Sequence, residues 1–136
     1  MQGRAFLDIA RELVSGGTES HWRATVVQAY YSLFLECRDA LTGWRIAVPL
    51  RQNVHTSVRL RYLYAANSEL KKLGRTLDEW CLHRNHASYH LSTLAKFTSE
   101  GLAQDSLTEI TAALALLDAI ESDPMRRAAA IASFPP

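Results

Sequence analysis

The chain has 136 residues, of which 48% are hydrophobic and 21% are charged, and its formal net charge is +1 at pH 7. This length suits one domain with one core, because two half-length domains would each be too small to bury one. The composition excludes a disordered chain and a strongly basic nucleic-acid-binding protein, so any anion site has to be local. Few Gly and Pro beside abundant Ala and Leu favour helices. We therefore expect a single all-α domain spanning residues 1–136, a bundle of about five helices.

Sequence features that the chain lacks indicate its cellular compartment. No apolar run approaches the roughly 20 residues needed to cross a bilayer, and the N-terminus has no basic patch followed by an apolar stretch. Cys37 and Cys81 fall inside predicted helices without a partner at a metal-ligand or redox-motif spacing. Such cysteines are typical of small buried side chains in a reducing compartment. We expect a cytoplasmic protein with no membrane contact.

Helical spacing of apolar residues organises the first half of the chain. Residues 4–14 predict a short amphipathic helix that ends in a Ser-Gly-Gly reversal. Thr18 is placed to cap a long second helix that ends at Gly43, and whose apolar positions cover more than one stripe. Such a helix packs against several neighbours or against a second subunit. Pro49 predicts an irregular stretch over residues 44–51, and a third helix is expected from Asn53 to about Ala66.

The second half of the chain predicts two more main helices. One runs from Glu69 to about Leu94 and is weakened or broken near Gly74. A polar connector over residues 98–105 leads to a helix over residues 107–120. Asp123-Pro124 then starts a weak Ala-rich helix, and the end of the chain from Phe134 should fray unless it docks on the rest.

The segment from His83 to His90 differs in composition from the helix that contains it. It holds three histidines, an arginine, an amide and a phenol in little more than two helical turns. At about 100° per residue, His83, His86 and His90 fall on nearly one face, Arg84 on an adjacent face and Asn85 on another. A helix that only completes a core does not need these residues, so this segment is the candidate site.

Arg84-Asn85 followed by His90, with five residues between Arg and His, resembles the arginine-polar-spacer-histidine motif of HEPN domains. Upstream, residues 28–34 and 38–41 are similar to the Ala-Tyr-Tyr-x-x-Phe second helix of that family. The resemblance covers about residues 4–120 and leaves 121–136 as a short C-terminal extension. It implies a HEPN-like up-and-down helical bundle.

The resemblance also implies a function, that of a homodimeric, metal-independent endoribonuclease of a toxin or defence system, which needs no cofactor. Arg84 would hold the scissile phosphate and stabilise the charge that develops on it. His90 would act as general acid and base, Asn85 would orient the substrate, and the product would carry a 2′,3′-cyclic phosphate. Further candidate RNA contacts are His86 and the basic residues on or near the third helix, Arg51, Arg59 and Arg61.

Two alternatives stay open. Residues 84–89 also resemble an Arg-x-x-Ala-Asp-Tyr pattern of other HEPN domains, with Ser88 in place of Asp. That alignment implies a catalytically inactive protein- or nucleotide-binding module that partners a nucleotidyltransferase, in which Arg84 is structural. Alternatively, His83, His86 and His90 could bind a divalent transition metal, although no carboxylate or cysteine completes the ligand set.

The remaining aromatic and histidine residues favour structural roles. Tyr30, Tyr31 and Phe34 recur at helical spacing, which is typical of core or interface residues rather than of base-stacking residues. His21 and His55 are interpreted as helix-surface or capping residues.

Overall fold

The computed structural model describes residues 1–48, 53–92 and 94–136. Within these ranges the chain forms six α-helices, one short 3-10 turn and no strand, which confirms the predicted all-α bundle. The elements are α1 (Ala5–Val14), α2 (Glu19–Gly43), α3 (Val54–Tyr64), α4 (Ser68–Tyr89), the 3-10 turn η1 (Ala95–Phe97), α5 (Gly101–Ser122) and α6 (Pro124–Ala132).

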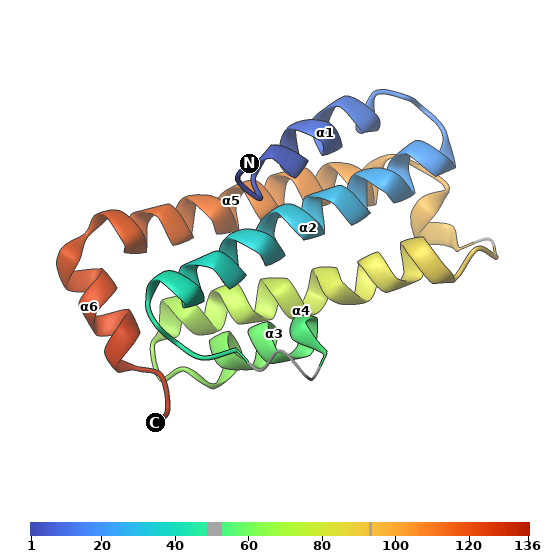
Figure 1. Ribbon diagram of the computed structural model, residues 1–136. Helices are drawn as coiled ribbons and strands as arrows, with labels where there is room; N and C mark the ends of the chain where they lie inside the picture. The colour runs from blue at the N-terminus through green and yellow to red at the C-terminus, as the bar shows by residue number, and fades with distance from the viewer. Residues whose placement is uncertain (49–52, 93) are drawn as a thin grey trace.

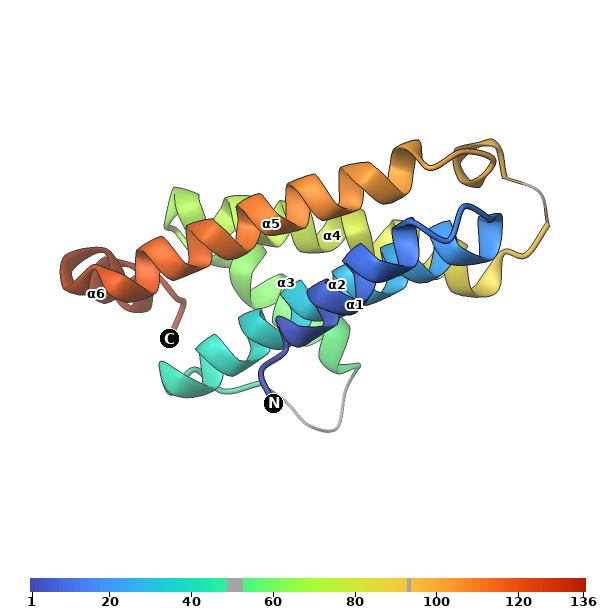
Figure 2. The ribbon, with the colours of Figure 1, turned by 90° about the horizontal axis from the view of Figure 1, so that it is seen from above.

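The helices α1, α2, α4 and α5 run in alternating directions along the bundle (Figure 1). The long helix α2 contacts α1, α4 and α5, which explains why its apolar positions cover more than one stripe. The short helix α3 packs against α4, and α6 turns back at one end of α5 (Figure 2). None of the helices in the described ranges is long and apolar enough to cross a membrane.

Short polar side chains start most of the helices. In each case a side-chain oxygen accepts a hydrogen bond from a backbone N–H in the first turn, which otherwise has no partner inside the helix. Thr18 does so for α2, as its sequence predicted. The other capping residues are Asn53 for α3, Asn67 for α4 and Asp123 for α6.

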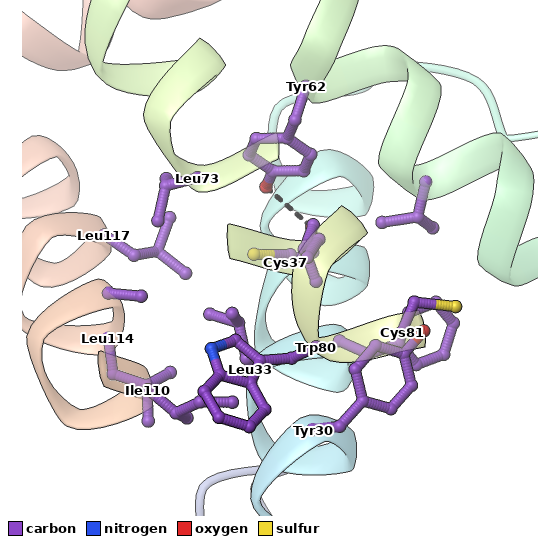
Figure 3. Close-up of a cluster of buried hydrophobic side chains, with 14 of the residues drawn as sticks. Tyr30, Leu33, Cys37, Tyr62, Leu73, Trp80, Cys81, Ile110, Leu114 and Leu117 are labelled. Atoms are coloured by element: carbon purple, nitrogen blue, oxygen red, sulfur yellow. Dashed lines mark hydrogen bonds between the residues drawn. The ribbon is translucent and has the colours of Figure 1, made fainter. Parts of the chain in front are cut away.

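The core lies between α2, α4 and α5 (Figure 3). Trp80 of α4 is buried there, and its indole Nε1 donates to Glu109 Oε2 of α5 at 2.6 Å. Tyr62 of α3 donates from its hydroxyl to the Cys37 carbonyl at 2.8 Å, which ties α3 to α2. Cys37 and Cys81 are both buried free thiols, as predicted.

The helix that carries the candidate motif differs from its predicted form. Gly74 does not break α4, because it lies where α3 crosses closely: a Cβ there would lie 2.8 Å from the backbone nitrogen of Leu63. The helix ends at Tyr89 instead of continuing to Leu94, since His90 leaves helical geometry at φ −105° and ψ 80°. The predicted polar connector is also shorter than expected, because α5 already begins at Gly101.

The C-terminal extension docks on the bundle. The Phe134 ring lies 5.9 Å from Trp44 and 6.4 Å from Tyr62, measured between ring centroids. The backbone N–H of Ala66 also donates to the carbonyl of Ser133 at 3.0 Å. Phe134 is therefore 9% exposed and completes the core at the end of α2. The predicted irregular stretch is observed over residues 45–48, while Pro49 and Arg51 lie outside the described residues.

Candidate functional site

Arg84 lies on the side of α4 that faces α2 and is 9% exposed. Its guanidinium carbon lies 5.1 Å from the ring centroid of Tyr30 and 5.6 Å from that of Tyr31. Its Nε has no hydrogen-bond partner, and no carboxylate in the described part of the chain forms an ion pair with it. Because arginine stays charged, a buried guanidinium without an ion-pair partner favours the binding of an anion.

His55, in the first turn of α3, lies against the same aromatic side chains. Its Nδ1 is 2.8 Å from the Tyr30 hydroxyl oxygen, and its ring stacks on Phe34 with centroids 4.1 Å apart. Burial and the positive charges of Arg84 and Arg59 lower the pKa of His55, so its imidazole is neutral near pH 7. The interpretation of His55 as a helix-surface or capping residue is therefore wrong, since its side chain is half-buried against Tyr30 and Phe34 of α2.

Arg59 closes this group of residues on the α3 side. Its Nη1 lies 3.2 Å from the Cys81 sulfur, and its Nε pairs with Asp78 at 3.0 Å. Burial, and then the neighbouring Cys81 thiol, raise the pKa of Tyr30, so the phenol keeps its proton. We call the following residues the Arg84 cluster: Tyr30, Tyr31, Phe34, His55, Arg59, Cys81 and Arg84.

The histidines of α4 form a second group on another side of the helix. Lys96 of η1 places its Nζ 3.2 Å from His83 Nδ1 and also contacts His86 Nδ1. The His86 and His90 rings are 4.9 Å apart between centroids. Burial and then the charge of Lys96 lower the pKa of both His83 and His86, which suits two neutral rings that accept hydrogen bonds from one amine. We call His83, His86, His90 and Lys96 the histidine-lysine cluster.

A metal site at these histidines is not formed. In the described part of the chain, no group of three or more His, Cys, Asp or Glu residues is placed to hold a metal ion. The Nδ1 atoms of His83 and His86 instead face the Lys96 amine.

Arg23 of α2 holds the end of α4 in place. It is buried, and its Nη1 donates to the carbonyls of His86, Ala87 and His90 at 3.1, 3.1 and 2.9 Å. The His86 carbonyl also accepts from the His90 N–H, whereas carbonyls in the last turn of a helix generally have no further partner inside the helix. The His90 side chain itself is exposed. Arg23 thus fixes the backbone of the proposed catalytic histidine and leaves its imidazole accessible.

The predicted site residues do not lie together in one place. Arg84 and Arg59 belong to the Arg84 cluster, whereas His90 and His86 belong to the histidine-lysine cluster. Asn85 lies beside Arg84 in sequence and is half-buried. Arg61 is turned to the loop after α2, where its Nε donates to the Ala47 carbonyl at 3.1 Å. Arg51 lies outside the described residues.

Sequence reasoning missed His55 and Arg23 as site residues. The only local signal for His55 is Asn53, whose side chain caps α3 and so fixes the turn that contains the histidine. Arg23 has no such signal, since an arginine five residues into a helix is typical of an exposed position.

Comparison of the chain with protein-family models, with curated protein sequences and with solved structures found no match.

Proposed function

We propose that the chain is a metal-independent endoribonuclease of HEPN type that acts in the cytoplasm as a homodimer, in a toxin or defence system. Arg84 carries this proposal. Its guanidinium is nearly buried on two tyrosine rings and has no carboxylate partner among the described residues. A phosphodiester supplies the missing negative charge, and its oxygens match the planar fork of arginine.

The proposed reaction divides its steps among the motif residues of the two protomers. Arg84 binds the non-bridging oxygens of the scissile phosphate and stabilises the charge that develops on them. His90 is exposed at the end of α4, where its imidazole transfers a proton to the departing oxygen. Asn85 orients the ribose. Attack of the ribose 2′-oxygen on phosphorus breaks the bond to the 5′-oxygen, which leaves a 2′,3′-cyclic phosphate and a 5′-hydroxyl.

The homodimer is supported by the outward face of α4. Leu82 and Tyr89 lie two helical turns apart on this face and are 53% and 73% exposed. Large apolar side chains on the helix that carries the motif favour a contact with another protein surface. A second copy packed there about a twofold axis would cover these side chains and bring the two α4 helices, each with its exposed His90, next to each other.

A second candidate function is that of a catalytically inactive module that binds a nucleotidyltransferase or a nucleotide. The separation of the proposed pair favours it: Arg84 lies against the tyrosines of α2, whereas His90 lies beside His86. A single protomer therefore does not bring the two groups together, and without a dimer Arg84 would serve only to bind or to stabilise.

The deciding experiment is cleavage of labelled structured RNAs in the presence of a chelator, with analysis of the product ends. Wild-type protein should give cyclic phosphate ends, and His90→Ala should lower the rate by about 100-fold or more. His21→Ala is the matched control, since the His21 ring contacts Thr18, the residue that caps its own helix α2. This variant should cleave RNA at the wild-type rate. Absence of cleavage by folded, dimeric wild-type protein on several RNAs would favour the binding module.

A further inference from the structure

We infer that His55 belongs to the phosphate site of Arg84, where its imidazole takes the proton from the ribose 2′-hydroxyl. The inference rests on the proposed function, and adds to it a catalytic residue from a different helix. Cleavage of RNA by this route needs a base for the 2′-hydroxyl and an acid for the 5′-oxygen. The HEPN-like motif provides one histidine per protomer, and the structure places a second imidazole beside the motif arginine.

The two groups share one aromatic support. The Tyr30 ring lies 5.1 Å from the Arg84 guanidinium carbon and 5.7 Å from the centroid of the His55 ring. Tyr31 lies 5.6 Å from the same guanidinium carbon and 6.0 Å from the His55 centroid. Burial, and then the charge of Arg84, lower the pKa of His55. A phosphate bound by Arg84 is therefore next to an imidazole that is already fixed in orientation.

His55 has the protonation state that a base requires. Among the described residues, the charged groups that face it are Arg84 on α4 and Arg59 on α3, and after burial both disfavour the imidazolium form. The Tyr30 hydroxyl holds Nδ1, which in the reactive tautomer carries the proton and donates it to the phenol oxygen. Among the described residues, no hydrogen-bond donor occupies the lone pair on Nε2. Tyr30 is thus a positioning residue, equivalent in role to the group that orients a catalytic histidine in other hydrolases.

The proton and electron balance of the step is complete. His55 Nε2 takes the 2′-hydroxyl proton as the 2′-oxygen forms its bond to phosphorus. The bond from phosphorus to the 5′-oxygen breaks, and that oxygen takes a proton from the imidazolium of His90 of the second protomer in the proposed dimer. His55 then returns its proton to solvent, which the nearby charges of Arg84 and Arg59 favour, and His90 is reprotonated. No oxidant, metal or other co-reactant takes part.

The kinetic test compares His55→Gln with wild-type protein on the same labelled RNA. Loss of the base should lower kcat by about 100-fold or more with little change in KM, and should remove the acidic limb of the pH profile of kcat. Tyr30→Phe should lower kcat less and move that limb, because the imidazole loses its orientation but stays in place. His21→Gln is the matched histidine control, and circular dichroism establishes that each variant is folded.

A second measurement does not need RNA cleavage. Inorganic phosphate added to isotope-labelled wild-type protein should shift the NMR signals of the His55 imidazole, and Arg84→Lys should weaken that response. Unmoved His55 signals, or a His55→Gln variant that cleaves RNA at the wild-type rate, would overturn the inference and leave the endoribonuclease proposal standing. A wild-type protein that cleaves no RNA would overturn both the proposed function and the proton transfer by His55. The phosphate titration would then test only whether Arg84 and His55 share one anion-binding site.

Discussion

The guanidinium of Arg23 on α2 donates a 2.9 Å hydrogen bond to the carbonyl of His90, the residue that follows the last turn of α4. The same group reaches the Ser92 carbonyl at 3.3 Å, and its carbon lies 4.5 Å above the Phe97 ring. One buried side chain therefore closes the end of α4 and holds the following segment against α2.

Arg23→Met should lower the free energy of unfolding by about 3 kcal/mol, because several partly or fully buried carbonyls lose a charged donor at once. Urea unfolding measures the change. Arg38→Met is the control, since Arg38 is exposed and its one ion pair among the described residues is with its neighbour Asp39, and it should change the stability by less than about 0.5 kcal/mol. Equal effects of the two substitutions would show that the carbonyl contacts of Arg23 contribute little.

Two helical glycines should respond in opposite directions to alanine. A Cβ on Gly74 would lie 2.8 Å from the backbone nitrogen of Leu63, so Gly74→Ala should force α3 and α4 apart and destabilise the protein by about 1–3 kcal/mol. A Cβ on Gly43 meets no atom within 4 Å. Gly43→Ala should therefore be neutral or stabilise by up to about 1 kcal/mol, through helix propensity. A stabilising Gly74→Ala would mean that the helices separate at little cost.

The stability of the fold should depend on pH through its histidines. Burial, followed by the charge of Lys96, lowers the pKa of His83 and of His86 below the ordinary value of 6.5. The unfolded chain then binds more protons than the folded one below pH 6.5, so the free energy of unfolding falls as the pH drops through the lowered values. Urea unfolding at about pH 7.5 and about pH 5.5 should show this loss. The double variant His83→Gln, His86→Gln should show a smaller loss, and an unchanged loss would contradict this origin.

Arg45 follows the end of α2 with a φ of 61°, in the left-handed region that favours glycine. This geometry lets the N–H of Ile46 donate to the Leu41 carbonyl at 2.9 Å, which closes the helix. Arg45→Gly should stabilise the protein by about 0.5–1 kcal/mol in thermal or urea unfolding. Arg45→Ala is the control for loss of the side chain, and an equal gain in both variants would exclude a backbone origin.

Much of the fold could be predicted because its signals are local. The spacing of apolar residues and the capping side chain of Thr18 predicted where α2 begins, and the low glycine content favoured helices throughout the chain. The end of α4 was not predicted, because Leu91 and Leu94 continue the apolar period in the sequence. The helix ends earlier because Arg23, distant in the chain, takes the carbonyls at its end.

The candidate site was predictable only in part. Arg84 and His90 were found from composition and spacing, and their roles stay proposals. His55 was not found, because its place depends on the packing of α3 across α2, where Tyr30 and Phe34 receive its ring. Those aromatic residues were interpreted as core or interface residues, and no local pattern indicates that a histidine from another helix stacks on them.

Phe134 contacts Trp44 and Tyr62, which are far from it along the chain. Contacts of such separation require closure of a long loop, whose entropic cost precedes the gain from the contacts, so we expect them to form late in folding. The energy of these ring contacts is then absent from the transition state for folding. Loss of the Phe134 ring should accordingly leave the refolding rate almost unchanged and speed unfolding, so this end of the chain governs how long the native bundle survives between openings.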